Sequence, residues 1–404
     1  ISKGLVGSEM CIRDRLNTPA KKDIVKFFLT EKLSLGIPFA SFFAPNFNNH
    51  GNYVMSLANF CRWLATQAEN LGVEIFPGFT AAEVIYENDT VKGILTGEMG
   101  LTKEGEKKPS YQPPMELRAK YTIFAEGCRG HLGKKLISKY ALDANSDPQH
   151  YGIGFKEVWD VPKEVHSEGT VMHSFGWPSK SNAGSYCYHG ENNQVYLGIV
   201  VPLDYSNPHI SPFDEFQQWK HHKDIKKLLE NGTRVAYGAR ALTKGGYHSR
   251  PKMTFPGGIL VGCDAGLMVF TKIKGTHTAM KSGMLAAESA FEAISKNRIG
   301  EDLIDFEEKL KSSWIETDLY KSRNMTALLH KYGTLIGGLI MGIEQFLFRG
   351  KLPFTWRHKT PDYACMKKAA ECEKIDYPKP DGVISFDKLS SVFLSNTNLS
   401  LIHI

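Results

Sequence analysis

The fold of this 404-residue chain is decided by the stretch Gly258-Ile259-Leu260-Val261-Gly262-Cys263-Asp264-Ala265-Gly266, with Gly275-Thr276-His277-Thr278-Ala279-Met280 following nine residues later. The apolar residues predict a buried strand, and the glycines after it predict a turn. A long Ala-rich helix is predicted over 276–297, and free amides at its start would face a carbonyl or an anionic ring edge. Read as structure only, Gly275 ends a loop and His277 is a packing histidine.

A second unit of the same kind lies earlier in the chain. The strand Tyr121-Thr122-Ile123-Phe124-Ala125 is followed by Glu126-Gly127-Cys128-Arg129-Gly130-His131-Leu132-Gly133 and a predicted helix over 134–139. Such glycines let a backbone approach a dinucleotide, and a helix start favours negative charge. The spacing is not GxGxxG, however, so a turn that only packs the strand on the helix is equally compatible.

The segments between these units predict the rest of the architecture. Around the first unit we expect a helix over 57–71 ended by Gly72, a strand over 73–76, a hairpin of 82–86 with 90–95, and a surface excursion over 97–114. The middle of the chain predicts β-strands over 152–158, 170–174, 185–189 and 194–203, then a helix from Pro212 to Gly232. Another helix is predicted over 299–323. Together these predict an α/β fold, α+β overall, with an inserted antiparallel sheet.

Composition excludes several classes of protein. The 49 basic and 43 acidic residues give a net charge of +6 without a basic stripe, so we expect no nucleic-acid partner. No apolar run approaches the length of a spanning helix. Seven widely spaced cysteines contain no CxxC pair, so we expect neither a disulfide framework nor a metal site.

One apolar segment predicts contact with a membrane surface. As a helix, 335–348 would rise only about 21 Å, short of a bilayer core of about 30 Å. Aromatic and cationic residues flank it, which favours a segment lying in the interface. A buried core helix is the alternative. The residues expected to contact lipid are Leu335, Ile336, Leu339, Ile340, Met341, Ile343 and Phe346.

Blocks of sequence, in order along the chain, resemble one known family. The chain resembles the electron transfer flavoprotein–ubiquinone oxidoreductase family from about Leu16 to Asn398. The blocks that carry the resemblance are Asn48–Tyr53, Ile123–Cys128, Gly176–Pro178, Phe216–His222, Tyr237–Leu242, Lys272–Gly283, Tyr377–Gly382 and Ile384–Asp387.

The resemblance implies a fold and a chemistry. It implies a glutathione-reductase-type FAD-binding fold with an inserted antiparallel-sheet ubiquinone-binding domain, and a 4Fe–4S cluster whose ligands lie outside this chain. Electrons would come from reduced electron transfer flavoprotein and go to ubiquinone, on the bacterial cytoplasmic membrane or the mitochondrial inner membrane. We expect a peripheral, monotopic monomer. The residues implied to lie along FAD are Gly127, Gly262, Gly275, Thr276 and His277, and those at ubiquinone are Gly245 and Gly246.

The expected division of the chain follows from the same resemblance. Residues 16–150 and 256–298 are assigned to the FAD domain and 151–255 to the ubiquinone domain. Residues 299–398 form a helical membrane-associated region and a linker, and 1–15 and 399–404 resemble non-native tails. No catalytic acid or base is expected, and His277 is the nearest candidate proton donor.

The chain also departs from the family pattern. It shows no GxGxxG segment and no set of cluster cysteines, so we expect an internal fragment that binds FAD poorly. Cys263 stands where flavin relatives often carry Asp, with Asp264 displaced by one, and Val269 stands in place of Asn. Two alternatives remain: a geranylgeranyl-reductase-like or hydroxylase-like flavoenzyme that uses NAD(P)H, and a membrane-docking scaffold that has lost its cofactor.

Overall fold

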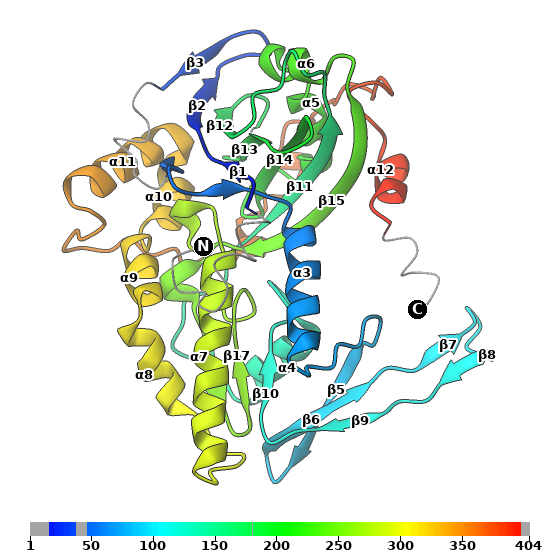
Figure 1. Ribbon diagram of the computed structural model, residues 1–404. Helices are drawn as coiled ribbons and strands as arrows, with labels where there is room; N and C mark the ends of the chain where they lie inside the picture. The colour runs from blue at the N-terminus through cyan, green and yellow to red at the C-terminus, as the bar shows by residue number, and fades with distance from the viewer. Residues whose placement is uncertain (1–15, 38–46, 180, 397–404) are drawn as a thin grey trace.

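A computed structural model describes residues 16–37, 47–179 and 181–396 (Figure 1). The expected tails at 1–15 and 399–404 lie outside the described residues. Two sheets organise the described chain: a large one of seven strands, in the upper part of Figure 1, and a small one of three strands below it.

The large sheet confirms the predicted β-rich middle of the chain. Its strand order is β15-β11-β14-β13-β12-β2-β3. Four of its strands match the predicted segments, namely β11 (Tyr151–Asp160), β12 (Thr170–Gly176), β13 (Gly184–His189) and β14 (Gln194–Pro202). A fifth strand, β15 (Thr233–Thr243), pairs antiparallel with β11 and was not predicted as a strand.

Two strands from early in the chain complete this sheet. β2 (Lys22–Phe28) pairs parallel with β12, and β3 (Ser34–Gly36) pairs antiparallel with β2. The expected division assigns residues 16–150 to the FAD domain, but the backbone hydrogen bonds of β2 and β3 extend the large sheet. The pairing of β2 with β12 joins segments almost 150 residues apart, which no local pattern reveals.

Helices cover one face of the large sheet. The expected single helix from Pro212 to Gly232 is wrong: α5 (Pro212–Trp219) and α6 (Lys223–Leu229) are separate. Lys220, between them, is fully buried, and its Nζ lies 3.0 and 2.8 Å from the two carboxylate oxygens of Glu157 on β11. Arg234 on β15 donates to the same carboxylate at 3.1 Å. This buried ion cluster lies at the break between the two helices, and the side chain of His222 caps α6 there by accepting from the backbone N–H of Asp224. α12 (Lys388–Leu394) lies beside β15.

The small sheet has the order β10-β17-β16, with β10 (Thr122–Phe124), β17 (Gly258–Leu260) and β16 (Thr254–Phe255). β10 and β17 pair in parallel, as the apolar runs predicted. Each is followed by a loop and a helix, α4 (His131–Lys139) after β10 and α7 (Thr276–Ser295) after β17. Apolar side chains of α7 and α4 pack with those of β17 in one buried cluster.

Around the small sheet, most local predictions are confirmed. α3 (Leu57–Asn70) ends where expected, and Gly72 has φ +84°. The hairpin of β5 (Ala81–Glu87) and β6 (Thr90–Thr96) is extended by β9 (Glu116–Arg118). The excursion at 97–114 is an exposed ribbon of β7 (Met99–Leu101) and β8 (Lys107–Gln112). β1 (Thr18–Pro19) and β4 (Tyr53–Val54) form a short pair.

The strand expected over 73–76 is wrong. Val73 and Phe76 are both more than half exposed, and no strand among the described residues pairs with this segment. Alternating apolar residues form a strand only where a neighbour supplies hydrogen-bond partners and covers the apolar face.

The chain after α7 is helical. The helix expected over 299–323 is two helices, α8 (Ile304–Ser312) and α9 (Trp314–Lys321), because the side chain of Ser313 caps α9 by accepting from the backbone N–H of Ile315. α10 (Met325–Tyr332), one π-helical turn η4 (Gly333–Gly337) and α11 (Gly338–Leu347) follow. In the described residues, none of the helices combines the length and apolar character needed to cross a bilayer.

Candidate functional site

The loop after β17 lies directly on the first turns of α7. Gly262 has φ +61°, a conformation that only glycine adopts without strain, and a Cβ there would come 3.3 Å from Cβ of Ala279. Its backbone N–H donates to Oγ of Ser282 at 3.1 Å. The predicted strand–glycine–helix unit is therefore present, with the loop held close to the helix.

The start of α7 presents free backbone donors. Gly275 is the N-cap residue, and no side chain caps the helix. Thr276, the first residue of the helix, is exposed. Gly275 lies close to the loop after β17, because a Cβ built on it would be 3.7 Å from Sγ of Cys263. The first N–H groups of a 20-residue helix thus have no side-chain acceptor, so this end can receive an anion or a carbonyl oxygen.

His277, the candidate proton donor, is packed against an aromatic ring. Its imidazole stacks on Trp314 with centroids 5.4 Å apart and an interplanar angle of 6°. Burial lowers the pKa of His277 to about 4, with nearby lysines adding to the effect, so the ring is neutral at pH 7. Nε2 is buried without a hydrogen-bond partner. His277 therefore packs against Trp314 but is not a fully hydrogen-bonded packing histidine, and its places along FAD and as a proton donor stay predictions.

The loop after β10 differs electrostatically from the start of α7. Glu126 accepts a hydrogen bond from the N–H of Gly133 at 2.7 Å, and Asp264 accepts one from the N–H of Glu126 at 3.3 Å. Burial is the main cause that raises the pKa of Asp264 to about 6; the hydrogen bond from the N–H of Glu126 opposes the rise, and the charge of Glu126 adds to it. Carboxylates of the protein therefore occupy the start of α4. Gly127 stays open, with only the Arg240 guanidinium, at 3.9 Å, near the position of a Cβ.

Asp264 is thus a structural neighbour of α4, and Val269 is fully buried.

The two expected ubiquinone glycines lie at the end of β15, and they differ. Gly245 donates its N–H to Oε1 of Gln149 at 3.0 Å, so that amide already has an acceptor. Gly246 opens the 3-10 turn η2 (Gly246–Ser249) with φ +64°, and no atom lies within 4 Å of a Cβ built there.

Gln149 joins this turn to the loop after β17. Its Nε2 lies only 2.7 Å from the position a Cβ on Gly266 would take, while its Oε1 accepts from Gly245. The two predicted glycine loops are therefore neighbours, connected through one side chain that the sequence analysis did not single out.

Two cavities adjoin the Gly245–Gly246 turn. A groove of about 400 Å³ is lined by Tyr247, Glu316, Thr317, Tyr320, Lys321 and Lys351. A second cavity of about 10 Å³, which is room for one water, is lined by Gly245 and by His150, His248 and His358 among others. Gly275 lines neither of them.

The predicted membrane segment turns its apolar side outward. Five of the seven expected lipid-contact residues are exposed, namely Leu335, Ile336, Leu339, Ile343 and Phe346. Ile340 is half-buried. The expectation for Met341 is wrong, because this side chain is 6% exposed and lies on the inner face of α11.

The inner face of α11 is partly polar. Oε1 of Glu344 accepts from the side-chain amide of Asn324 at 2.8 Å, and Gln345 donates to the carbonyl of Lys321 at 2.9 Å. A surface helix in water shows the opposite pattern, with apolar residues inside and polar ones outside.

Sequence reasoning missed the polar residues that surround the Lys244–Gly246 turn. Lys244 is buried and donates to Asp204 at 2.9 Å, and His150, His330 and His358 lie nearby. The contacting residues are separated by up to about 200 positions, so no spacing motif could have found them.

Comparison with known proteins fits this geometry. The sequence model of a family described as "ETF-QO, ubiquinone-binding" matches residues 151–242, which is β11 to the end of β15. The chain is 56% identical, over 389 residues, to the electron transfer flavoprotein-ubiquinone oxidoreductase of Pseudomonas aeruginosa, covering 95% of this chain and 70% of that protein. It is 49% identical to the human mitochondrial protein of the same name, covering 63% of it.

Solved structures show the fold alone. A geranylgeranyl bacteriochlorophyll reductase-like protein from Thermoplasma acidophilum has a TM-score of 0.58 at 17% identity, covering 85% of this chain and 78% of that one. A flavin-dependent brominase has a TM-score of 0.52 at 15% identity, covering 80% of this chain and 73% of that one. The arrangement of mixed sheets and helices is therefore shared with these two proteins. On its sequence identity to full-length relatives, the chain belongs to the electron transfer flavoprotein–ubiquinone oxidoreductase family.

Proposed function

We propose that this chain forms the flavin and ubiquinone sites of an enzyme that takes electrons from reduced electron transfer flavoprotein and reduces ubiquinone to ubiquinol at a membrane surface. The observation that carries the proposal is the bridge through Gln149, which brings the Gly266 loop and the Gly245 turn together. An enzyme that passes electrons from a flavin to a quinone needs the two rings close to one another.

The residues at the start of α7 fit the ring end of FAD. The uncapped N–H groups after Gly275 suit the carbonyl edge of the flavin, which carries negative charge when the flavin is reduced. The Gly262 turn allows the loop to approach closely, and Thr276 is accessible. FAD supplies the electron-carrying ring when bound, and the role of this chain is to hold and orient that ring.

The groove beside Tyr247 fits a quinone head. Its volume of about 400 Å³ lies in the range of small-molecule sites. Gly246, next to Tyr247, leaves open space in which a planar ring can approach the backbone. Tyr247 and Tyr320 form one wall of the groove, with their rings edge to face and their centroids 5.4 Å apart. This wall offers aromatic surface to the quinone ring.

The outward apolar face of η4 and α11 is where we place the membrane. Lys351, which lines the groove, follows α11 by only a few residues, so the groove opens beside that face. The isoprenoid tail of a quinone could then remain in lipid while the head enters the groove. The protein would lie on the bilayer as a peripheral monomer, and the iron–sulfur cluster ligands would lie outside this chain.

The test is electron flow in the protein in which this sequence is continued to the length of its relatives. With FAD bound, reduced electron transfer flavoprotein should reduce a soluble ubiquinone analogue, and the preparation should show an iron–sulfur EPR signal. NADPH should give no reduction. Rapid reduction by NADPH without a cluster signal would contradict the proposal and favour the geranylgeranyl-reductase-like reading, and failure to bind flavin would favour the scaffold.

A further inference from the structure

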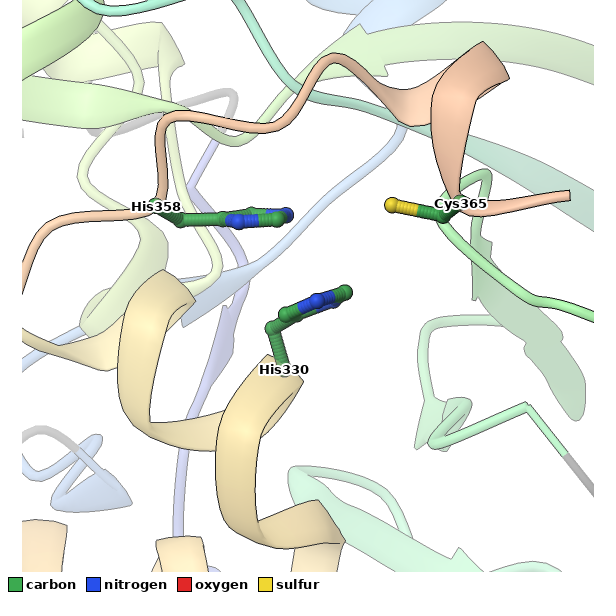
Figure 2. Close-up of side chains that lie close together, drawn as sticks. All are labelled: His330, His358 and Cys365. Carbon is green, nitrogen blue, oxygen red and sulfur yellow. The ribbon is translucent and has the colours of Figure 1, made fainter.

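Three imidazoles stack where α10 meets the segment that follows α11. His150 and His358 have ring centroids 4.2 Å apart at an interplanar angle of 6°, and His330 and His358 have centroids 3.7 Å apart at 21°. Figure 2 shows Sγ of Cys365, from the 3-10 turn η5 (Asp362–Cys365), pointing towards the edges of the His330 and His358 rings. One ligand atom each of His330, His358 and Cys365 lie within 4.8 Å of one another.

His358 offers an unused nitrogen. Its side chain is nearly buried, Nε2 makes no hydrogen bond, and Oδ2 of Asp204 is 3.8 Å away. Burial, together with the neighbouring His150 and His330, lowers the pKa of His358 to about 4. The ring is therefore neutral at pH 7, which is the form that binds metals.

His330 is oriented by a carboxylate. Its Nδ1 lies 3.0 Å from Oδ2 of Asp204, which leaves Nε2 as the free nitrogen. A carboxylate that holds the second nitrogen of a histidine is the usual support of a metal ligand. Burial would raise the pKa of Asp204, but hydrogen bonds from His330 and Lys244 hold it below its usual range. The charged Asp204 therefore offsets Lys244, whose ammonium would otherwise repel a cation.

A second set of groups, His150, His358 and Asp362, is less suited to a metal. Both ring nitrogens of His150 already have partners, at 2.7 Å from Oδ1 of Asp362 and at 2.9 Å from the carbonyl oxygen of His358. A metal on this set would have to break those contacts in a buried place. On the other set, Sγ of Cys365 makes only a long contact of 3.7 Å with a carbonyl oxygen.

We infer that His330, His358 and Cys365 form a binding site for a Zn²⁺-type cation, with a fourth position open to water or to another ligand. Two imidazoles and a thiolate select zinc over magnesium and calcium, which prefer oxygen. Bond lengths of about 2.0 Å to nitrogen and about 2.3 Å to sulfur need the three atoms closer together than they now lie. A metal lies in the plane of each imidazole that binds it, so the stacked rings of His330 and His358 would have to rotate relative to one another on binding, and His330, which is a third exposed, has the room to do so.

The metal would join two elements of the fold. The Sγ–H bond of Cys365 breaks, the sulfur binds the metal, and the proton goes to solvent, so affinity rises with pH. Burial raises the pKa of the Cys365 thiol, so that rise in affinity extends to higher pH. The bound ion would tie η5 to α10, beside the buried Lys244 that precedes the Gly245–Gly246 turn.

The experiment is a titration of the 404-residue chain with Co²⁺, which replaces Zn²⁺ and absorbs light. We expect visible bands of a four-coordinate ion and a near-ultraviolet thiolate charge-transfer band, both displaced by Zn²⁺ but not by Mg²⁺. Cys365→Ser should abolish the thiolate band and weaken binding at least about tenfold. Cys372→Ser, a change of another partly exposed cysteine in the same segment, should alter neither. His330→Ala should weaken binding while leaving the circular dichroism spectrum unchanged.

Three outcomes would overturn the inference. The first is the absence of Co²⁺ bands, and the second is a thiolate band that persists in Cys365→Ser. The third is binding that depends on Asp362, as shown by Asp362→Asn, but is unaffected by Cys365→Ser, which would move the site to the other set.

Discussion

Asp264 shows how its surroundings set the charge of a single side chain. It is nearly buried at the junction of the β17 loop and α4, and the carboxylate of Glu126 lies close to it. Both conditions favour its neutral form, so its pKa is raised to about 6. An acid whose pKa is raised on folding makes the folded state bind more protons than the unfolded state between the two pKa values.

Asp264→Asn should therefore change how stability depends on pH. In the present chain, the contribution of Asp264 falls as pH rises from about 4 to about 6, because the folded state must give up a proton that it holds more tightly. Asn keeps an oxygen for the N–H of Glu126 and cannot ionise. The variant should match the parent at low pH and exceed its free energy of unfolding by on the order of 3 kcal/mol above pH 6.

Denaturant unfolding at a series of pH values measures this difference. Asp143→Asn, a change of an exposed carboxylate, is the matched control and should leave the pH dependence unaltered. The explanation is wrong if Asp264→Asn and Asp143→Asn give the same curve as the parent.

At the residue scale, the sequence predicted positions better than partners. The sequence predicted Gly262 in a turn and Gly275 at a helix start, and both are found there. Such predictions succeed because glycines and helical periodicity are local signals. It could not predict that Asp264 meets Glu126 or that Gln149 meets Gly245, since those contacts depend on how distant segments pack.

Among the elements, α11 departs furthest from the pattern of a helix in water. Leu339 is 66% exposed, while Glu344 on the opposite side is buried with Asn324. An outward apolar face on a helix too short to span a bilayer fits a segment that lies in the membrane interface.

Leu339→Glu with Ile343→Glu should release the protein from lipid. Both side chains are exposed, so the change should not disturb the core, but two carboxylates at the hydrocarbon boundary oppose insertion. We expect at least a tenfold loss of binding to liposomes in a flotation assay, with unchanged thermal unfolding. Leu389→Glu on α12, which lies on the opposite side of the molecule in Figure 1, is the control and should bind as the parent does. Equal binding by all three proteins would show that α11 does not contact lipid.

Elements with a strong local pattern were predicted, and those that depend on distant partners were not. The β5–β6 hairpin follows from alternating residues around Asn88 and Asp89, which both have positive φ in the turn. The segment at 73–76 has a similar apolar alternation but lacks a pairing neighbour among the described residues. The sequence did not predict the break between α8 and α9 at Ser313, because apolar residues continue at helical spacing across it. The break depends on one hydroxyl, that of Ser313, which accepts from the backbone N–H of Ile315.

For the whole molecule, the central feature is that two glycine loops from different sheets meet. The loop after β17 belongs to the small sheet, and the Gly245 turn leaves β15 of the large sheet. Resemblance to a family gave both loops a role, but the sequence alone could not show that they are neighbours. The structure does so through Gln149, whose side chain contacts both loops.

The central claim is tested most directly by how fast a soluble ubiquinone analogue reoxidises the reduced flavin. The protein of full family length is loaded with FAD and photoreduced without oxygen, and the analogue is then added. The flavin absorbance should return at a rate that saturates with the analogue. Gln149→Leu, which keeps the volume but removes both hydrogen-bonding groups, should slow it at least about tenfold without changing flavin content. A flavin that stays reduced in the presence of the analogue, or an unchanged rate in Gln149→Leu, would contradict the claim that the two loops form one site.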